Sequence, residues 1–188
     1  MSRPHQRPQD PDPIAALAVG ISGSPRSPSR SKTLAELLLK ALAERGYKTR
    51  LIDLAVLPAD ALLARTQSAD VDEAIASVGE ARIVIASTPT YRALYTGLLK
   101  AFFDLMPQGH LRAKVCIGLQ TGIAREHYLS PDYGLRPLFA SLEGIPVAGI
   151  YATDDEFVEG APSARVLEWV TELAGRATAL TGPAPTQP

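Results

Sequence analysis

The chain has 188 residues, a formal net charge of -1 and 21% charged residues. This length suits one domain with a sizeable core, and the near-neutral charge argues against general binding to nucleic acid or to an acidic membrane surface. We therefore expect partners that are small molecules or specific proteins. Cys116 is the single cysteine, which excludes a disulfide within the chain. With no signal peptide or spanning segment visible, we expect a cytoplasmic location.

Both ends of the sequence are rich in proline and polar residues. The first thirteen residues read MSRPHQRPQDPDP, and the last eight read TGPAPTQP. Such segments bury too little apolar surface to offset the entropy lost on ordering. The sequence therefore predicts disordered tails over 1–13 and 181–188, and a single domain over 14–180.

Between the ends, short apolar runs alternate with segments of helical periodicity. The runs are rich in Ile and Val and predict strands buried on both faces. Strands that alternate with helices pair in parallel through right-handed crossovers, so we expect an α/β fold with a doubly wound sheet. The predicted strands cover 14–22, 49–54, 82–88, 114–121 and 147–153. The predicted helices cover about 34–42, ending at Gly46 as a left-handed cap, and roughly 70–80, 94–106, 134–143 and 163–178.

The segment GISGSPRSPSRSKTL, residues 20–34, connects the first strand to the first helix. The N-terminus of a helix offers free N–H groups and a positive dipole end, which favour an anion. Gly23 allows close approach of the backbone, and hydroxyl and cationic side chains gather around it. We therefore expect a terminal phosphate to bind here. The donors are Ser22, Ser24, Ser29, Ser31, Arg26, Arg30 and Lys32.

Two common phosphate motifs are absent from this loop. GISGSP satisfies neither the P-loop pattern nor the dinucleotide pattern G-x-G-x-x-G, so ATP and tightly bound NAD are disfavoured. A phosphomonoester held by hydroxyl groups, as in flavin mononucleotide (FMN), fits better. An ordinary polar turn with a helix cap stays open as the alternative.

Two later loops suit a flat ring. The segment after the third strand, TPTYRALYTGLLKAFFDLMP, begins with a turn that offers backbone groups and an aromatic surface. After the fourth strand, Thr121 and Gly122 place backbone N–H groups where the pyrimidine edge of a flavin gains negative charge on reduction. The residues of the first turn are Pro89, Thr90, Tyr91 and Arg92.

At these positions the chain resembles the NAD(P)H-dependent FMN reductases of flavodoxin-like fold, in particular those serving two-component alkanesulfonate monooxygenases. SGSPRSPSRS, TPTYRALYTGLLKAFFDLMP and DYGLRP carry the resemblance, which extends over about residues 15–160. It implies a flavodoxin-like five-stranded parallel sheet in the order 2-1-3-4-5, with helices on both faces. It also implies hydride transfer from NADPH or NADH to FMN, and delivery of reduced FMN to a separate oxygenase.

The resemblance also assigns residues. Ser24, Arg26, Ser29 and Ser31 match the family's phosphate loop, Pro89 to Arg92 its ring-binding turn, and Thr121 and Gly122 its third loop. Ile123 stands where the subgroup usually carries a second glycine. Tyr133 matches an added residue that forms a π-bulge at a subunit interface and loosens FMN, so that flavin acts as a substrate. Simple packing of Tyr133 is the alternative.

For hydride transfer between stacked rings, the protein has only to position the rings and stabilise the developing charge. We therefore expect no catalytic acid or base and no metal. A flavodoxin-type electron carrier, or a quinone or azo-compound reductase with bound FMN, stays open as an alternative function.

The helix around LYTGLLKAFFDLM has apolar residues on more than one face, which predicts a homodimer or homotetramer. The residues concerned are Phe102, Phe103, Leu105 and Met106.

Overall fold

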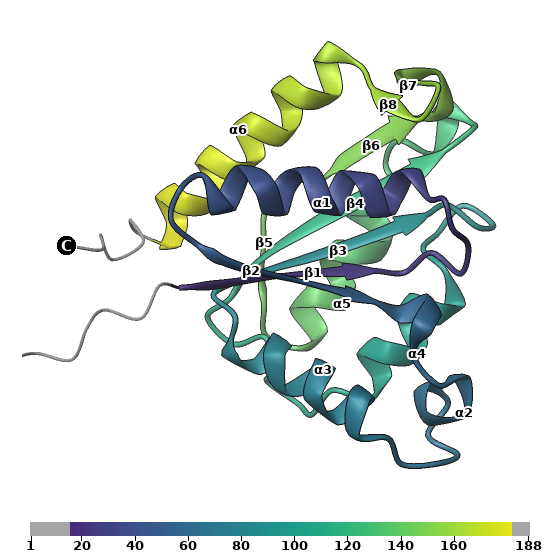
Figure 1. Ribbon diagram of the computed structural model, residues 1–188, viewed down its shortest axis with the longest axis vertical. Helices are drawn as coiled ribbons and strands as arrows, with labels where there is room; N and C mark the ends of the chain where they lie inside the picture. The colour runs from purple at the N-terminus through teal and green to yellow at the C-terminus, as the bar shows by residue number, and fades with distance from the viewer. Residues whose placement is uncertain (1–15, 182–188) are drawn as a thin grey trace, which may run out of the picture.

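The computed structural model describes residues 16–181, which form an α/β fold around one parallel sheet. The strand order is β2-β1-β3-β4-β5, with β6 also paired to β4. The predicted doubly wound order is therefore confirmed, and the loops that follow the strands meet at one edge (Figure 1). The strands are β1 (Leu17–Ser22), β2 (Lys48–Asp53), β3 (Ile83–Pro89), β4 (Val115–Gly122), β5 (Ile145–Pro146) and β6 (Ile150–Thr153).

The position of the fifth strand is filled by two short strands. The prediction of one continuous strand over 147–153 is wrong, because β5 pairs with the start of β4 and β6 with its end. Between them, Gly149 approaches the carbonyl oxygen of Gly118 so closely that a Cβ atom would not fit. This close approach lies between β5 and β6, where the ladder with β4 is interrupted.

Helices cover both faces of the sheet, as predicted. Figure 1 shows α1 and α6 on one face, and α3, α4 and α5 on the other. Each face buries its own apolar cluster against the sheet. A short hairpin, β7 (Phe157–Val158) and β8 (Ala161–Pro162), precedes the last helix. The helices are α1 (Arg30–Ala43), α2 (Ala59–Leu62), α3 (Ala69–Glu80), α4 (Gly97–Asp104), α5 (Arg136–Ser141) and α6 (Ala164–Thr181).

Helix α1 begins inside the serine-rich segment. Ser29 is its N-cap, and the side-chain Oγ accepts a hydrogen bond from the Lys32 N–H at 3.3 Å. The helix buries an apolar stripe that includes Leu34 and Leu38. Gly46 follows with a φ of +87°, which confirms the predicted left-handed cap.

Two predicted helices have different boundaries in the structure. The helix predicted over 94–106 begins only at Gly97, because the preceding residues form a tight turn and Thr96 caps the helix by accepting from the Leu99 N–H at 3.1 Å. The helix predicted over 134–143 is preceded by a π-helix (Pro131–Leu135) and ends at Ser141.

The described chain begins and ends at the same edge of the sheet, opposite the loops that follow the strands (Figure 1). Arg82 ties the two ends together, because its N–H donates to the Leu17 carbonyl at 2.9 Å and its guanidinium to the Thr181 carbonyl at 3.1 Å. The tails predicted over 1–13 and 181–188 lie outside the described residues, except that Thr181 is the last residue of α6. Within residues 16–181, no helix is long and apolar enough to cross a bilayer.

Cys116 lies in β4 and is fully buried. Burial raises the pKa of its thiol to about 12, so the thiol stays protonated and unreactive at neutral pH. This agrees with the apolar surroundings of Cys116 in the sequence, and it gives the cysteine a packing role.

Candidate functional site

A cavity of about 390 Å³ opens at the edge of the sheet where the strands end. Its walls come from the loop between β1 and α1, the turn after β3, the loop after β4 and the residue after β6. Parallel pairing brings these four distant segments together. The lining residues are Ser24, Arg26, Pro28, Ser29, Arg30, Pro89, Thr90, Tyr91, Thr121, Gly122, Ile123, His127 and Asp154.

The cavity gathers most of the site residues predicted from the sequence. Ser22, Ser31, Lys32 and Arg92 do not line it, and Ser22 is fully buried at the end of β1. Ser31 is fully buried, and its Oγ lies 3.0 Å from the Oγ of Ser29, so it supports Ser29 from behind. Arg92 occupies the exposed tip of the turn after β3. The predicted residues that do line the cavity are Ser24, Arg26, Ser29, Arg30, Pro89, Thr90, Tyr91, Thr121 and Gly122.

The serine-rich loop is anchored to the sheet and to α4. The Gly23 N–H donates to the Ser87 carbonyl at 2.7 Å, and the Thr96 hydroxyl donates to the Gly23 carbonyl at 2.6 Å. A Cβ atom at position 23 would lie 2.8 Å from the Cβ of Leu99. Glycine is therefore required here by the close packing of the loop on α4.

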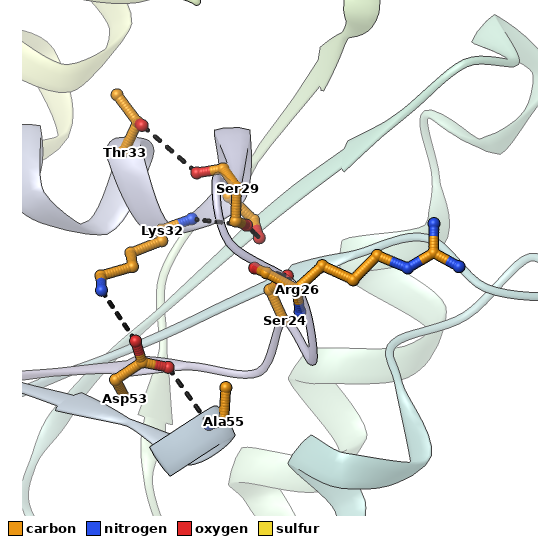
Figure 2. Close-up of polar contacts among 8 residues, drawn as sticks. Ser24, Arg26, Ser29, Lys32, Thr33, Asp53 and Ala55 are labelled. Carbon is orange, nitrogen blue, oxygen red and sulfur yellow. Dashed lines mark hydrogen bonds and ion pairs between the residues drawn. The ribbon is translucent and has the colours of Figure 1, made fainter.

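The cations of this loop differ in their partners (Figure 2). The Lys32 Nζ donates to the Asp53 Oδ2 at 2.7 Å, and this hydrogen bond raises the pKa of Lys32. Asp53 also accepts from the Ala55 N–H at 3.1 Å, so its carboxylate is already engaged. Figure 2 shows the Arg26 side chain extending away from Asp53, and within residues 16–181 its guanidinium has no hydrogen-bond or ion-pair partner. Arg26 therefore brings an uncompensated positive charge to the cavity.

Two ion pairs hold the segment that follows β6. The Arg30 Nη1 donates to the Asp154 Oδ2 at 3.0 Å, and the Arg125 Nη2 donates to the Asp155 Oδ2 at 2.5 Å. Arg30 is the first residue of α1, and Arg125 lies in the loop after β4. The segment is thereby tied to two walls of the cavity.

Hydrogen bonds join the turn after β3 to the end of β4, which together form another wall of the cavity. The Gln120 Nε2 donates to the Thr90 Oγ1 at 3.0 Å, and the Thr90 N–H donates to the Thr121 carbonyl at 2.7 Å. A Cβ atom on Gly122 would collide with the Tyr151 hydroxyl and lie 3.1 Å from the Thr90 Cβ. A side chain at position 122 would therefore have to displace the Tyr151 hydroxyl, and with glycine the backbone itself forms this part of the wall.

The turn after β3 contains two residues in the left-handed region. Arg92 and Ala93 have φ values of +51° and +67°, and the Tyr91 and Leu94 backbones exchange hydrogen bonds of 2.8 and 3.2 Å across them. Left-handed conformations cost free energy in residues other than glycine, so packing must hold this turn. A Cβ atom at Gly134 would lie 3.0 Å from Leu94, which shows how closely the turn packs on the π-helix.

The π-helix lies where the resemblance implied a bulge. The Arg136 N–H donates to the Pro131 carbonyl, five residues earlier, and Tyr133 lies between them. The Tyr133 side chain is 73% exposed. Within a single chain Tyr133 therefore makes little packing contact, and its role in flavin exchange stays a prediction.

Three of the lining residues are not assigned to the site from the sequence: Pro28, His127 and Asp154. Asp154 directly follows the predicted fifth strand, so the rule that loops after parallel strands converge would have found it. Residues 16–181 hold no group of three or more potential metal ligands.

Comparison with known proteins identifies the family. Residues 17–159 match the model of the NADPH-dependent FMN reductase family. The chain belongs to this family. An FMN reductase (NADPH) of Pseudomonas putida is 34% identical over 160 residues, which cover 83% of this chain and 81% of the relative.

Two further members extend the comparison. The NADH-dependent FMN reductase SfnE of Pseudomonas putida is 33% identical over 170 residues, covering 87% of this chain and 91% of the relative. The apo crystal structure of the NADH:FMN oxidoreductase EmoB superposes with a TM-score of 0.83 at 32% identity, covering 92% and 93% of the two chains. Relatives named for NADPH and for NADH thus match the chain to a similar degree.

Proposed function

We propose that the protein is an NAD(P)H:FMN oxidoreductase whose cavity binds FMN, with the phosphate on the loop before α1. The uncompensated Arg26 guanidinium carries this proposal, because it lines the same cavity as the Ser24 and Ser29 hydroxyls at the N-terminus of an α-helix. Ser31 contributes through its hydrogen bond to Ser29.

The residues present fit FMN. Hydroxyl groups, an arginine and helix N–H groups suit a phosphate dianion, and the exposed Tyr91 ring and the backbone at Gly122 suit a flat ring system. The turn of Pro89, Thr90, Tyr91 and Arg92 would hold one side of the ring, and Thr121 and Gly122 the other. The cavity volume of about 390 Å³ lies within the range typical of small-molecule sites.

The chain's part in the reaction is positioning. The serine-rich loop fixes the phosphate, the turn after β3 orients the ring, and backbone N–H groups near Thr121 and Gly122 meet charge that develops at the pyrimidine edge. When both are bound, FMN accepts a hydride from the nicotinamide, so that NAD(P)H, a proton and FMN give NAD(P)⁺ and FMNH₂. No side chain is assigned as an acid or a base.

Reduced FMN then serves a separate flavin-dependent monooxygenase, of the alkanesulfonate type that the resemblance implies, in the cytoplasm. Support comes from the π-helix that contains Tyr133, because the resemblance links this bulge to the release of flavin. A flavodoxin-type carrier, or a quinone or azo-compound reductase, would share the fold and FMN. Sustained turnover of free flavin distinguishes the proposed reductase from a carrier.

We expect FMN to be turned over with a KM at least about tenfold lower than that of riboflavin, because charge-assisted hydrogen bonds to the phosphate contribute about 1.5–3 kcal/mol each. Steady-state oxidation of NADPH and of NADH, followed at 340 nm with each flavin, measures this. Equal kcat/KM for the two flavins would contradict a phosphate anchor. NADPH oxidation that stops after one equivalent of flavin would contradict the reductase.

We also propose a homodimer or homotetramer, on a basis different from the sequence argument. Phe102, Phe103 and Met106 pack in the core of a single chain, so the earlier reason for assembly was wrong. Instead, large apolar side chains are exposed on the turn after β3, on the loop after β4 and on the π-helix, and two of them, Tyr91 and Ile123, line the cavity. These exposed side chains are Tyr91, Leu94, Ile123, Tyr128 and Tyr133.

Light scattering at micromolar concentration should give two or four times the chain mass of 20.0 kDa. Tyr133→Glu should shift the protein towards the monomer, because it places a charge in the buried interface. Val158→Glu is the matched control, since Val158 is 68% exposed on the β7–β8 hairpin. A monomeric wild-type protein, or equal dissociation by both variants, would contradict this assignment.

A further inference from the structure

The cavity contains two arginines, and only one of them is free of a carboxylate. Arg26 has no ion-pair partner among the described residues, whereas Arg30 donates to Asp154 at 3.0 Å. Arg30 directly follows Ser29, the cap of α1, and Asp154 directly follows β6. Both members of this pair line the cavity that we assign to FMN.

We propose that Asp154 weakens the hold of the cavity on the FMN phosphate, and thereby sets how readily flavin leaves. This proposal rests on the proposed function. Asp154 acts in two ways: it engages the Arg30 guanidinium that the phosphate would otherwise receive, and it adds a negative charge to a site that accepts a dianion.

The geometry favours an effect on binding over an effect on folding. The Arg30 and Asp154 side chains are 47% and 34% exposed, and ion pairs that water reaches contribute little to stability. A ligand with two negative charges at the start of α1 competes directly for the same guanidinium. Asp154 is therefore a residue that tunes affinity through Arg30, and it takes no part in the chemical step.

The next residue provides an internal comparison. Asp155 carries the same charge on the same segment, yet it pairs with Arg125 at 2.5 Å and does not line the cavity. It also accepts a hydrogen bond from the Thr153 hydroxyl, which fixes the segment at the end of β6. Asp155 thus carries an equal charge outside the cavity in a pair that is 74% and 58% exposed and contributes little to stability, while Asp154 lines the cavity.

The test compares Asp154→Asn with Asp155→Asn, which remove equal charge from adjacent positions. Dissociation constants for FMN and riboflavin come from flavin fluorescence titration, and FMN release rates from stopped-flow dilution. We expect Asp154→Asn to bind FMN about three- to tenfold more tightly and to release it correspondingly more slowly. Riboflavin binding by this variant, and FMN binding by Asp155→Asn, should stay within about twofold of the wild-type values.

If the wild-type protein binds FMN, three results would overturn the proposal for Asp154 and leave the proposed function standing. They are unchanged or weaker FMN binding by Asp154→Asn, equal tightening of riboflavin by that variant, and equal tightening of FMN by Asp155→Asn. The second result would place Asp154 at the ring, and the third would show an effect of net charge alone. Failure of the wild-type protein to bind FMN would overturn the proposed function as well.

Discussion

Arg26→Ala is expected to raise the dissociation constant of FMN at least about tenfold, because charge-assisted hydrogen bonds contribute about 1.5–3 kcal/mol. The effect should be large because the Arg26 guanidinium has no ion-pair partner among the described residues that would offset its charge. Flavin fluorescence titration measures the constant. The melting temperature should stay near the wild-type value, since Arg26 is exposed.

Two further variants make this result specific. Arg26→Lys keeps the charge but loses the planar fork of donors, so its FMN affinity should lie between those of the wild type and the alanine variant. Arg65→Ala removes an arginine that is 72% exposed and lies outside the cavity, so FMN binding should not change. Equal affinity of Arg26→Ala and wild type would remove the loop before α1 from the phosphate site.

Deletion of Tyr133 is expected to yield protein that retains FMN through purification and is yellow. Removing one residue converts the π-helix into regular α-helical hydrogen bonding, and by the resemblance the bulge is what loosens flavin. Turnover of free flavin should fall at the same time, because release becomes slow. The measurements are bound FMN per chain and the melting temperature of the same preparation.

Tyr133→Ala is the matched control for this deletion. It removes the exposed ring but keeps the residue count, so the π-helix and ready flavin exchange should persist. Because the side chain is 73% exposed, neither variant should lose core contacts. A colourless deletion variant with a lowered melting temperature would contradict a role in flavin exchange and indicate a structural one.

The sequence predicted those elements of the fold whose signals lie within one short segment, and it missed features that depend on contacts between distant segments. The strand of β1 and the helix of α1 follow from an apolar run, a capping serine and Gly46, all of which lie close together in the sequence. The fifth strand is divided at Gly149, which lies against the backbone of Gly118, and only the folded chain brings these two residues together. The tight turn before α4 likewise depends on packing against Gly134.

The site shows the same division between local and distant causes. The serine-rich loop was recognisable because its hydroxyls and charges are contiguous in the sequence. Ser29 and Ser31 nevertheless have different roles, because Ser29 is the N-cap and lines the cavity, whereas Ser31 is fully buried and lies behind it, with its Oγ 3.0 Å from that of Ser29. The pairing of Arg30 with Asp154 joins positions 124 residues apart, and no local pattern predicts it.

The arrangement of the chain ends has a practical consequence. β1 starts and α6 finishes at the edge of the sheet opposite the cavity, where Arg82 joins them. A carrier domain, affinity tag or surface tether joined directly before β1 or directly after α6 therefore leaves from the far side of the molecule. Immobilised in this way, the protein presents its cavity outward to a soluble acceptor.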